Sequence, residues 1–361
     1  MKALVFFGVN NPLEYKRGVE NVILSQIDAV RSEFDKIYYI HLGNSNDKYV
    51  WGDINCYTVK KNFRTSFSLF FLLKKIKDSN ENVTIHSHST LTSFLSFYQT
   101  DILTIHDGLY YLRKSINHPL SFLHYLVEKF VYRRCSLVHF ISEYTKQKSL
   151  FSTGKFVVIG NTTPLEKISK EMNISSYDRL FDEKKFNIFS VRGIQQRTNI
   201  DLLIELAEFF KLHEILLHGR TVHITISGKG PLLEHYREKI VNKGLNNITL
   251  LGFVDDSEVV KRYCDCDLVL VPALHSEGFG LPIIEAYLFN KTALASNVCA
   301  MPEVIFDNKH LFSNELSDLV RVIQDFCNGQ EKQLDKFYKE KYSNKIYAER
   351  MKRMYRGVYE K

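Results

Sequence analysis

Short apolar runs alternate with longer segments of helical periodicity from the first residues of the chain onward. Five runs in the first half have the length and the composition of buried strands: ALVFFGV, KIYYIHL, VTIHSH, DILTIHD and SLVHFIS. A helix is predicted between the first two runs, over about residues 18–32. This alternation is typical of a parallel α/β sheet, so a doubly wound α/β domain is predicted over residues 1–163.

A second series of the same kind follows the polar, helix-poor segment LEKISKEMNISSYDRLFDEKK, which is interpreted as a linker over residues 164–184. Its predicted strands are FNIFSVRG, VHITISGKG, NITLLGF, CDLVLVPA and TALASNV. A second doubly wound α/β domain is therefore predicted over residues 185–340, and the two domains are expected to face each other across a cleft. Ligands of open α/β sheets bind at the carboxyl ends of the strands, so the loops after the strands are the expected binding regions.

The last segment, residues 341–361, predicts a helix with one apolar stripe. Its apolar residues recur at spacings of three and four positions: Tyr347, Met351, Met354, Tyr355 and Val358. We expect this helix to return to the N-terminal domain and to pack on it.

Composition supports a two-domain protein and limits its partners. A chain of 361 residues with a hydrophobic fraction of 45% can fill two cores. The formal net charge of +7 favours anionic partners, which could be nucleotides, nucleic acids or acidic lipids. No recognised nucleic-acid-binding pattern is present in the sequence, so we expect no nucleic acid partner.

The distribution of cysteines and the length of the apolar runs indicate in which cellular compartment the protein works. The six cysteines are scattered without a CxxC pair, which favours a reducing compartment. No apolar run approaches the length of about 20 residues that spans a bilayer, so any membrane contact is expected to be peripheral. A cytoplasmic protein, working at the inner face of the plasma membrane, is predicted.

The stretch SEGFGLPIIEA, residues 276–286, carries the chemistry that is easiest to interpret. A buried strand leads into a loop with Gly278 and Gly280, and Pro282 then stands at the first turn of a helix, the position that proline prefers. The unpaired amides and the dipole of a helix N-terminus bind phosphate, and glycine permits close approach. Glu277 and Glu285 flank this turn and could accept hydrogen bonds from hydroxyl groups on both sides of a diphosphate.

The segment CDCD, residues 264–267, could be mistaken for a metal site. Two thiols without a nearby histidine cannot complete a zinc shell. Asp267 opens the buried strand LVLVP, which argues against a DxD metal motif. We therefore expect no metal at this position.

The glutamate pair around GFGLP resembles the signature of the retaining glycosyltransferases of the GT4 family, which have the GT-B fold of two Rossmann-like domains. The resemblance extends over nearly the whole chain. It implies that Glu277 holds hydroxyls of a donor sugar and Glu285 holds ribose hydroxyls of the nucleotide. It also assigns the donor's sugar or phosphate groups to the loop Gly278, Phe279, Gly280 and Leu281.

Other segments resemble further donor-binding parts of this family. FSVRGIQQRTNIDLLIEL is similar to the opening of the second domain, where an arginine and a lysine neutralise the diphosphate. Arg192 and Arg197 fill those places, the second with arginine instead of lysine. ISGKGP and LLGFVDD are similar to the loops near the nucleotide, which implies roles for Gly228, Gly230 and the backbone around Phe253.

In the N-terminal domain, RGVENVILSQ resembles a glycine-rich loop before a helix that lies against the donor diphosphate. Gly18 is the candidate in this loop, and Arg17 stands where a second glycine is common. TIHDGL places His106 at a strand end, and the resemblance implies that His106 contacts the donor sugar near the reaction centre. Without the family, a structural histidine is the more frequent interpretation.

The resemblance predicts an enzyme that moves a sugar from a nucleotide-diphosphate-sugar donor to a hydroxyl of a saccharide or lipid-linked saccharide acceptor, with retention. The implied catalytic residues are His106, Glu277, Arg192 and Arg197, and neither a cofactor nor a metal is expected. A role in surface polysaccharide or glycolipid biosynthesis is predicted. Two alternatives stay open, a GT-B nucleotide-sugar epimerase and a non-catalytic nucleotide-sugar-binding protein.

Peripheral contact with an anionic membrane is predicted from KKNFRTSFSLFFLLKKIK, residues 60–77. Its phenylalanines share a helical face, and its lysines and arginine flank that face. Further basic residues of the same domain are Arg113, Lys114, Lys129, Arg133 and Arg134. The alternative is that the apolar stripe packs on the sheet and the lysines are merely solvated.

Overall fold

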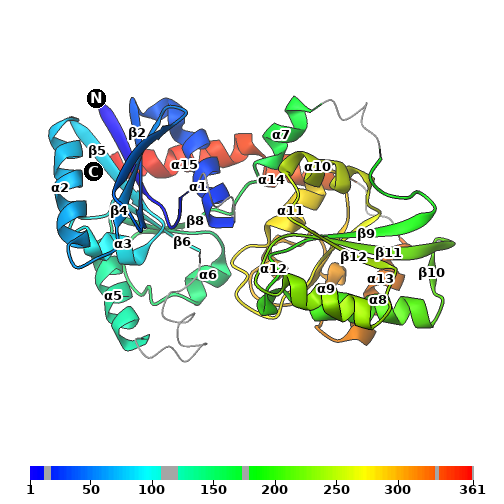
Figure 1. The fold of residues 1–361 in the computed structure, drawn as a ribbon. Coiled ribbons are helices and arrows are strands. Elements are labelled where there is room, and N and C mark those ends of the chain that lie inside the picture. Colours follow the sequence, from blue (N-terminus) through cyan, green and yellow to red (C-terminus); the bar gives the residue numbers. More distant parts are fainter. Residues whose placement is uncertain (12–17, 107–120, 173–178, 330–332, 360–361) are drawn as a thin grey trace. The chain divides into compact units, whose positions relative to one another are not determined.

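The structure is a computed structural model of the chain, and it describes residues 1–11, 18–106, 121–172, 179–329 and 333–359. The chain divides into two compact units (Figure 1). The first unit combines Met1–Thr162 with Asn344–Lys361, and the second is Thr163–Ser343. Each unit is an α/β sandwich around its own sheet, as the alternation of strands and helices predicts.

The first unit contains an eight-stranded sheet. Its strands are β1 (Lys2–Phe7), β2 (Lys36–Gly43), β3 (Asp47–Trp51), β4 (Ile54–Lys60), β5 (Asn82–Ser87), β6 (Ile102–Ile105), β7 (Leu137–Phe140) and β8 (Phe156–Val158). They lie in the order β3-β4-β2-β1-β5-β6-β7-β8, and only β3 pairs antiparallel to its neighbour. The hairpin of β3 and β4 turns at Gly52, where φ is +60°.

Helices cover both faces of this sheet. They are α1 (Gly18–Val30), α2 (Thr65–Asp78), α3 (Thr90–Leu95), α5 (Ser121–Arg134), α6 (Glu143–Gln147) and α15 (Asn344–Tyr359), with a 3-10 turn at Arg31–Glu33. Successive residues of β1 point to opposite faces: Leu4 and Phe6 pack with α1 and α15, whereas Val5 and Phe7 pack with α2. The central strand is therefore buried on both sides, which explains why ALVFFGV is apolar throughout.

The second unit contains a seven-stranded sheet. Its strands are β9 (Lys185–Val191), β10 (Leu216–Leu217), β11 (Arg220–Ser227), β12 (Ile248–Gly252), β13 (Leu268–Val271), β14 (Ala293–Ser296) and β15 (Leu311–Phe312). The order is β10-β11-β9-β13-β14-β15, and β12 also pairs with β11. Only β10 is antiparallel, and the five predicted strands of this part of the chain correspond to β9, β11, β12, β13 and β14.

The helices of the second unit precede, connect and follow these strands. They are α7 (Leu165–Glu171), α8 (Ile200–Leu212), α9 (Leu233–Asn242), α10 (Asp256–Asp265), α11 (Leu281–Leu288), α12 (Met301–Val304), α13 (Leu316–Cys327) and α14 (Leu334–Lys341). None of the helices in the described residues is long and apolar enough to cross a membrane.

The structure differs from the predicted organisation in two places. The segment predicted as a helix-poor linker, 164–184, begins with α7, where Leu165 is buried and the carboxylate of Glu166 accepts a hydrogen bond from the Tyr338 hydroxyl at 3.1 Å. A helix of seven residues is too short to show a clear apolar periodicity in the sequence. The segment predicted as one terminal helix, 341–361, begins with the last residue of α14 and contains the whole of α15, and the boundary between the units falls between the two helices.

A chain of buried polar groups ties α15 to the sheet of the first unit. The carbonyl oxygen of Ile159 can only accept, so His139 donates to it from Nε2 at 2.9 Å and must accept at Nδ1. Thr104 Oγ1 donates to that nitrogen at 2.8 Å and accepts from His86 Nε2 at 2.7 Å. The remaining nitrogen of His86 then accepts from the hydroxyl of Tyr355 on α15. One carbonyl therefore fixes the proton positions of the whole chain.

We expect Tyr355→Phe to lower the free energy of unfolding by about 1–3 kcal/mol, because the buried Nδ1 of His86 loses its donor. Urea denaturation of the full chain, followed by circular dichroism, measures this change. Tyr57→Phe is the control, since Tyr57 is half-exposed and its hydroxyl has no hydrogen bond to a described residue; its effect should stay within about 0.5 kcal/mol. Equal effects of both substitutions would contradict the buried chain.

Candidate functional site

The loop after β13 reverses sharply before it enters α11. Ser276 has a φ of +56° and Gly280, the N-cap of α11, has a φ of +89°. Pro282 lies in the first turn of the helix, as the sequence predicts. The backbone carbonyl of Glu277 accepts a hydrogen bond from the amide of Ala300 at 3.2 Å, which holds the loop in place. The helix N-terminus therefore follows a fixed, glycine-dependent turn.

Two arginines converge on the first glutamate of this loop. Arg192 Nη2 lies 3.0 Å from Glu277 Oε2, and Arg197 Nη1 lies 3.8 Å from the same oxygen. Arg197 also donates to the carbonyl oxygen of Ser276 at 2.8 Å. Arg192 is only 5% exposed, and its Nε has no hydrogen-bond partner in the described part of the chain. Two guanidinium groups share one carboxylate, so the cluster has an uncompensated positive charge.

The predicted glycines of the β11 loop make room for the backbone that carries these arginines. A Cβ on Gly228 would lie 1.7 Å from the carbonyl oxygen of Arg192, and a Cβ on Gly230 would lie 2.0 Å from that of Ile194. The two loops are joined by hydrogen bonds from the amide of Arg192 to the Ser227 carbonyl, at 2.9 Å, and from the amide of Ile194 to the Lys229 carbonyl, at 2.9 Å. Glycine at both positions is therefore a steric requirement.

Phe253, in the loop after β12, is an exposed aromatic residue of the predicted set. Its ring is 59% exposed, and Lys229 Nζ lies 4.2 Å from the ring centroid. This cation–π contact joins the loops after β11 and β12. Phe279, by contrast, is buried and packs edge-on against Tyr342, so only its backbone can face a ligand.

Glu285, inside α11, is surrounded by hydroxyl groups. One carboxylate oxygen accepts from Thr163 Oγ1 at 3.0 Å, and the other accepts from the Tyr263 hydroxyl at 2.9 Å. Burial raises the pKa of Glu285 to about 7, although both hydrogen bonds act in the opposite direction. Each oxygen keeps a second acceptor position, so the carboxylate can still bind two ligand hydroxyls.

His106 and Gly18 belong to the first unit. His106 directly follows β6, and its Nε2 lies 2.7 Å from Nδ1 of His88. Burial, with a smaller contribution from His139, lowers the pKa of His106 to about 3, so its imidazole is neutral near pH 7. Gly18 begins α1 and is exposed; an added Cβ would meet no described atom within 4 Å. Arg17 lies outside the described residues.

The acidic residues of the CDCD segment have structural partners. Asp265 accepts a hydrogen bond from the amide of Leu180 at 2.8 Å. Asp267 pairs with Arg220 at 2.7 Å and accepts from the amide of Asn187 at 2.7 Å. No group of histidine, cysteine, aspartate and glutamate side chains within the described ranges could hold a metal ion.

Sequence reasoning did not find Thr163, Tyr263 and Lys229. Thr163 and Tyr263 are far from Glu285 along the chain, and only the fold brings their hydroxyls to its carboxylate. Lys229 had a local signal, since it lies between the two predicted glycines of ISGKGP.

Residues 171–343, nearly the whole second unit, match the family described as glycosyl transferases group 1. The second unit belongs to that family. The serotype-specific mannosyltransferase WbdA of Escherichia coli is 31% identical over 140 residues, which are 38% of this chain and 17% of WbdA. The chain thus spans less than a fifth of that relative's length.

Solved structures match the chain over nearly its full length. Sucrose-phosphate synthase from Thermosynechococcus elongatus has a TM-score of 0.78 at 14% identity, with 99% of each chain covered. Anabaena HepE, solved in complex with UDP-glucose, has a TM-score of 0.71 at 15% identity, with 98% of this chain and 99% of that chain covered. At such low identity these matches show the fold, which is GT-B. The predictions of a glycosyltransferase and of two Rossmann-like domains are confirmed, whereas the GT4 assignment stays a prediction.

We expect Gly230→Ala to lower the melting temperature by about 2 °C or more, because the new methyl group would overlap the Ile194 carbonyl. Thermal unfolding of the full chain measures the change. The matched substitution is Gly329→Ala, where an added Cβ meets no described atom within 4 Å and the melting temperature should hardly move. Similar melting temperatures for both variants would show that the β9 and β11 loops are less tightly packed than described.

Proposed function

We propose that this glycosyltransferase moves a sugar from a nucleotide-diphosphate-sugar donor to a hydroxyl of a saccharide or lipid-linked saccharide acceptor, with retention at the anomeric carbon. The observation that carries the proposal is the cluster of Arg192, Arg197 and Glu277 before the N-terminus of α11, in a unit that belongs to the group 1 family.

The cluster supplies what the departure of a nucleoside diphosphate requires. Negative charge develops on the diphosphate as the glycosidic bond breaks, and preorganised cations stabilise that charge. Arg192 is held rigid by burial and by Glu277, and the two arginines together carry one more charge than the carboxylate neutralises. Guanidinium groups and helix amides can thus do what a divalent cation does in other transferases. We therefore propose a metal-independent reaction.

The two glutamates are proposed to orient the donor on either side of its diphosphate. Glu277 would hold hydroxyls of the sugar, and the amides of Gly278, Phe279, Gly280 and Leu281 would hold sugar or phosphate oxygens. Glu285 would hold the ribose hydroxyls through the acceptor positions that Thr163 and Tyr263 leave open. Gly228, Gly230 and the backbone at Phe253 are proposed to border the nucleotide.

His106 is proposed to contact the donor sugar, and Gly18 to lie in the loop that faces the diphosphate. A neutral imidazole can both donate and accept a hydrogen bond, so His106 suits a sugar hydroxyl better than a phosphate. Its partner His88 restricts the orientation of the ring. Neither residue of the first unit is proposed as a nucleophile.

The relatives point to a class of product without fixing the sugar. WbdA is named a mannosyltransferase, whereas HepE was solved with UDP-glucose. We propose a role in surface polysaccharide or glycolipid biosynthesis, in the cytoplasm at the inner face of the plasma membrane. No feature of the described residues favours the epimerase or the non-catalytic alternative, and turnover of a nucleotide sugar separates them from the transferase.

We expect Arg192→Ala and Glu277→Ala each to lower the rate of donor turnover about a hundredfold or more, because each removes a charge that acts on the donor. A panel of nucleotide sugars, screened first by thermal shift and then by nucleotide release in EDTA, identifies the donor and measures the rate. EDTA is included because the proposed charge stabilisation comes from the protein.

Arg220→Ala is the control for this experiment. Arg220 forms a partly buried ion pair with Asp267 in the same unit, so its loss perturbs stability without touching the cluster. Its turnover should stay within about threefold of the parent, since it contributes no charge to the donor site. Turnover within the same range in Arg192→Ala or Glu277→Ala would refute the assignment, and activity that requires added manganese or magnesium would refute metal independence.

We also propose that the first unit docks on an anionic bilayer through an aromatic-basic surface formed by α2 and the residues just before it. Its phenylalanines are exposed, from 36% at Phe70 to 86% at Phe63, and the side chains that α2 buries are Thr65, Leu69, Leu73 and Ile76. The phenylalanines thus lie outside the face of α2 that packs on the sheet. The cations around them have no ion pair with a described residue: Lys60, Lys61, Arg64, Lys74, Lys75 and Lys77. Arg113 and Lys114, also predicted to contribute, lie outside the described residues.

We expect the protein to float with vesicles that contain phosphatidylglycerol and to remain at the bottom of the gradient with neutral vesicles. Each basic residue near an anionic surface contributes about 1 kcal/mol to the binding free energy. Replacing Lys74, Lys75 and Lys77 with glutamate should abolish flotation. The charge-matched control replaces Lys184, Lys309 and Lys336, exposed lysines of the second unit, with glutamate. A parent protein that never floats at low salt, or two variants that behave alike, would contradict docking through α2.

A further inference from the structure

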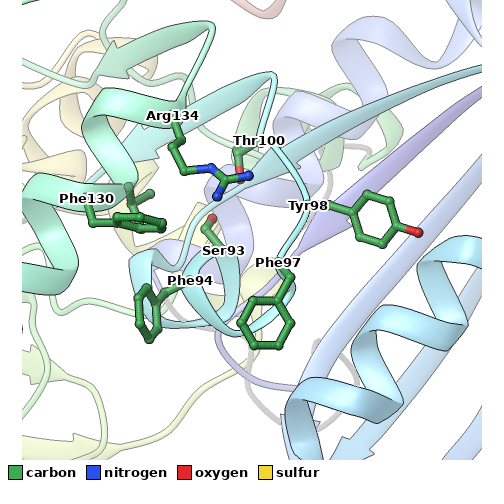
Figure 2. Close-up of a pocket in the computed structure, with 8 residues that line it drawn as sticks. Ser93, Phe94, Phe97, Tyr98, Thr100, Phe130 and Arg134 are labelled. Carbon is green, nitrogen blue, oxygen red and sulfur yellow. The ribbon is translucent and has the colours of Figure 1, made fainter.

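A small pocket lies beside the aromatic-basic surface, between α3, the segment that follows it, and α5 (Figure 2). Its volume is about 50 Å³, several times what one water molecule needs. Its lining combines aromatic side chains with a few polar ones: Ser93, Phe94, Phe97, Tyr98, Thr100, Phe130, Val131 and Arg134. None of the predicted site residues lines it.

Two donors in the pocket lining, Ser93 and Arg134, have no acceptor among the described residues. Ser93 is 5% exposed, and its buried hydroxyl has no hydrogen-bond partner in the part of the chain that the structure describes. Arg134, the last residue of α5, forms no ion pair with a described residue. In Figure 2 its guanidinium group points toward the hydroxyl groups of Ser93 and Thr100. A buried hydroxyl without a partner is costly to the fold, which indicates that a ligand supplies the acceptor.

The rim of the pocket is apolar and exposed. Phe97 is 61% exposed and has a φ of +58°, a left-handed conformation that is rare for an aromatic residue. Phe130 is also exposed, and the Arg134 guanidinium lies 5.3 Å from the centroid of its ring. A strained backbone that holds an aromatic ring in water is more common at binding sites than elsewhere.

Ring contacts connect the pocket to α2. Tyr98, in the pocket lining, stacks on Phe70 of α2 with the ring centroids 5.3 Å apart. Lys77, at the end of the same helix, lies 4.7 Å from the centroid of Tyr98. The pocket is therefore continuous with the surface that is proposed to dock on the bilayer.

From this geometry we infer that the pocket binds the phosphate group of an anionic phospholipid. The Arg134 guanidinium and the hydroxyls of Ser93 and Thr100 donate hydrogen bonds to the phosphate oxygens, and the rings of Phe97 and Phe130 contact the acyl region. The inference rests on the membrane docking proposed for the first unit, and it adds a specific site to a surface that otherwise recognises charge alone.

The test measures binding of dihexanoyl phosphatidic acid, a short-chain lipid with a free phosphate, by isothermal titration calorimetry on the full chain. Glycerol 3-phosphate, which lacks the acyl chains, and dihexanoylglycerol, which lacks the phosphate, are the comparison ligands. We expect phosphatidic acid to bind at least tenfold more tightly than either, because only this lipid satisfies both the donors and the rim. Equal binding of phosphatidic acid and glycerol 3-phosphate would overturn the inference in favour of a free-phosphate site.

Two pocket variants have matched controls. Arg134→Gln and Ser93→Ala should each weaken binding of phosphatidic acid about tenfold, as expected for a lost hydrogen bond to a charged group. Arg133→Gln removes the same charge from the same helix end without touching the pocket, and Ser66→Ala removes a hydroxyl from α2; both should bind within about twofold of the parent. Equal loss in Arg134→Gln and Arg133→Gln would show that charge alone is recognised and would overturn the inference.

Stability gives a second, independent measurement. Ser93→Ala removes a buried hydroxyl without a described partner, so the melting temperature should stay the same or rise while lipid binding weakens. A lower melting temperature would indicate that Ser93 serves the fold and would count against the site.

Neither pocket variant should alter nucleotide-sugar turnover, so failure of the transferase proposal and failure of this one are distinguishable. If both pocket variants float like the parent and bind phosphatidic acid with the same affinity, the pocket proposal is refuted while the docking proposal stands.

Discussion

The Arg192 guanidinium is a buried cation, and a buried cation requires a partner. Glu277 supplies it at 3.0 Å, but Glu277 reaches this position only because the loop after β13 reverses at Ser276 and Gly280. The backbone of Arg192 in turn occupies the space that a side chain at Gly228 would fill. The loops after β9, β11 and β13 are thus held together by the charge of Arg192 and by the absence of a side chain at Gly228.

The same constraint explains how the site can remain positively charged. Arg197 shares the carboxylate of Glu277 at a longer distance and is anchored through the carbonyl of Ser276, so it needs no carboxylate of its own. A second acidic residue at this point would neutralise the cluster and weaken its attraction for a diphosphate. Glu285 avoids that effect because burial raises its pKa to about 7. Near neutral pH its carboxyl group is therefore only partly ionised.

The first unit places its polar groups in two contrasting ways. In its core, histidines remain neutral and pass hydrogen bonds from α15 to a backbone carbonyl, as the pKa of His139, lowered to about 4 by burial, reflects. On its surface, cations of α2 and α5 have no ion pair among the described residues and stand next to exposed aromatic rings. The first arrangement stabilises the fold, whereas the exposed rings of the second gain nothing from burial and are better explained by a partner.

The amino-acid sequence by itself determined the two α/β units, the central strands and the turn before α11, because burial on both faces, helical periodicity and Gly-Pro spacing are local signals. It did not reveal the hairpin of β3 and β4, since a half-exposed edge strand lacks a continuous apolar run. Nor did it decide which side of α2 faces the sheet. Only the tertiary structure showed that Leu69 and Leu73 are buried while Phe67 and Phe71 are exposed, and only folding brought Thr163 and Tyr263 to Glu285. Contacts between residues far apart in the chain depend on the packing of whole elements, and no local pattern encodes that packing.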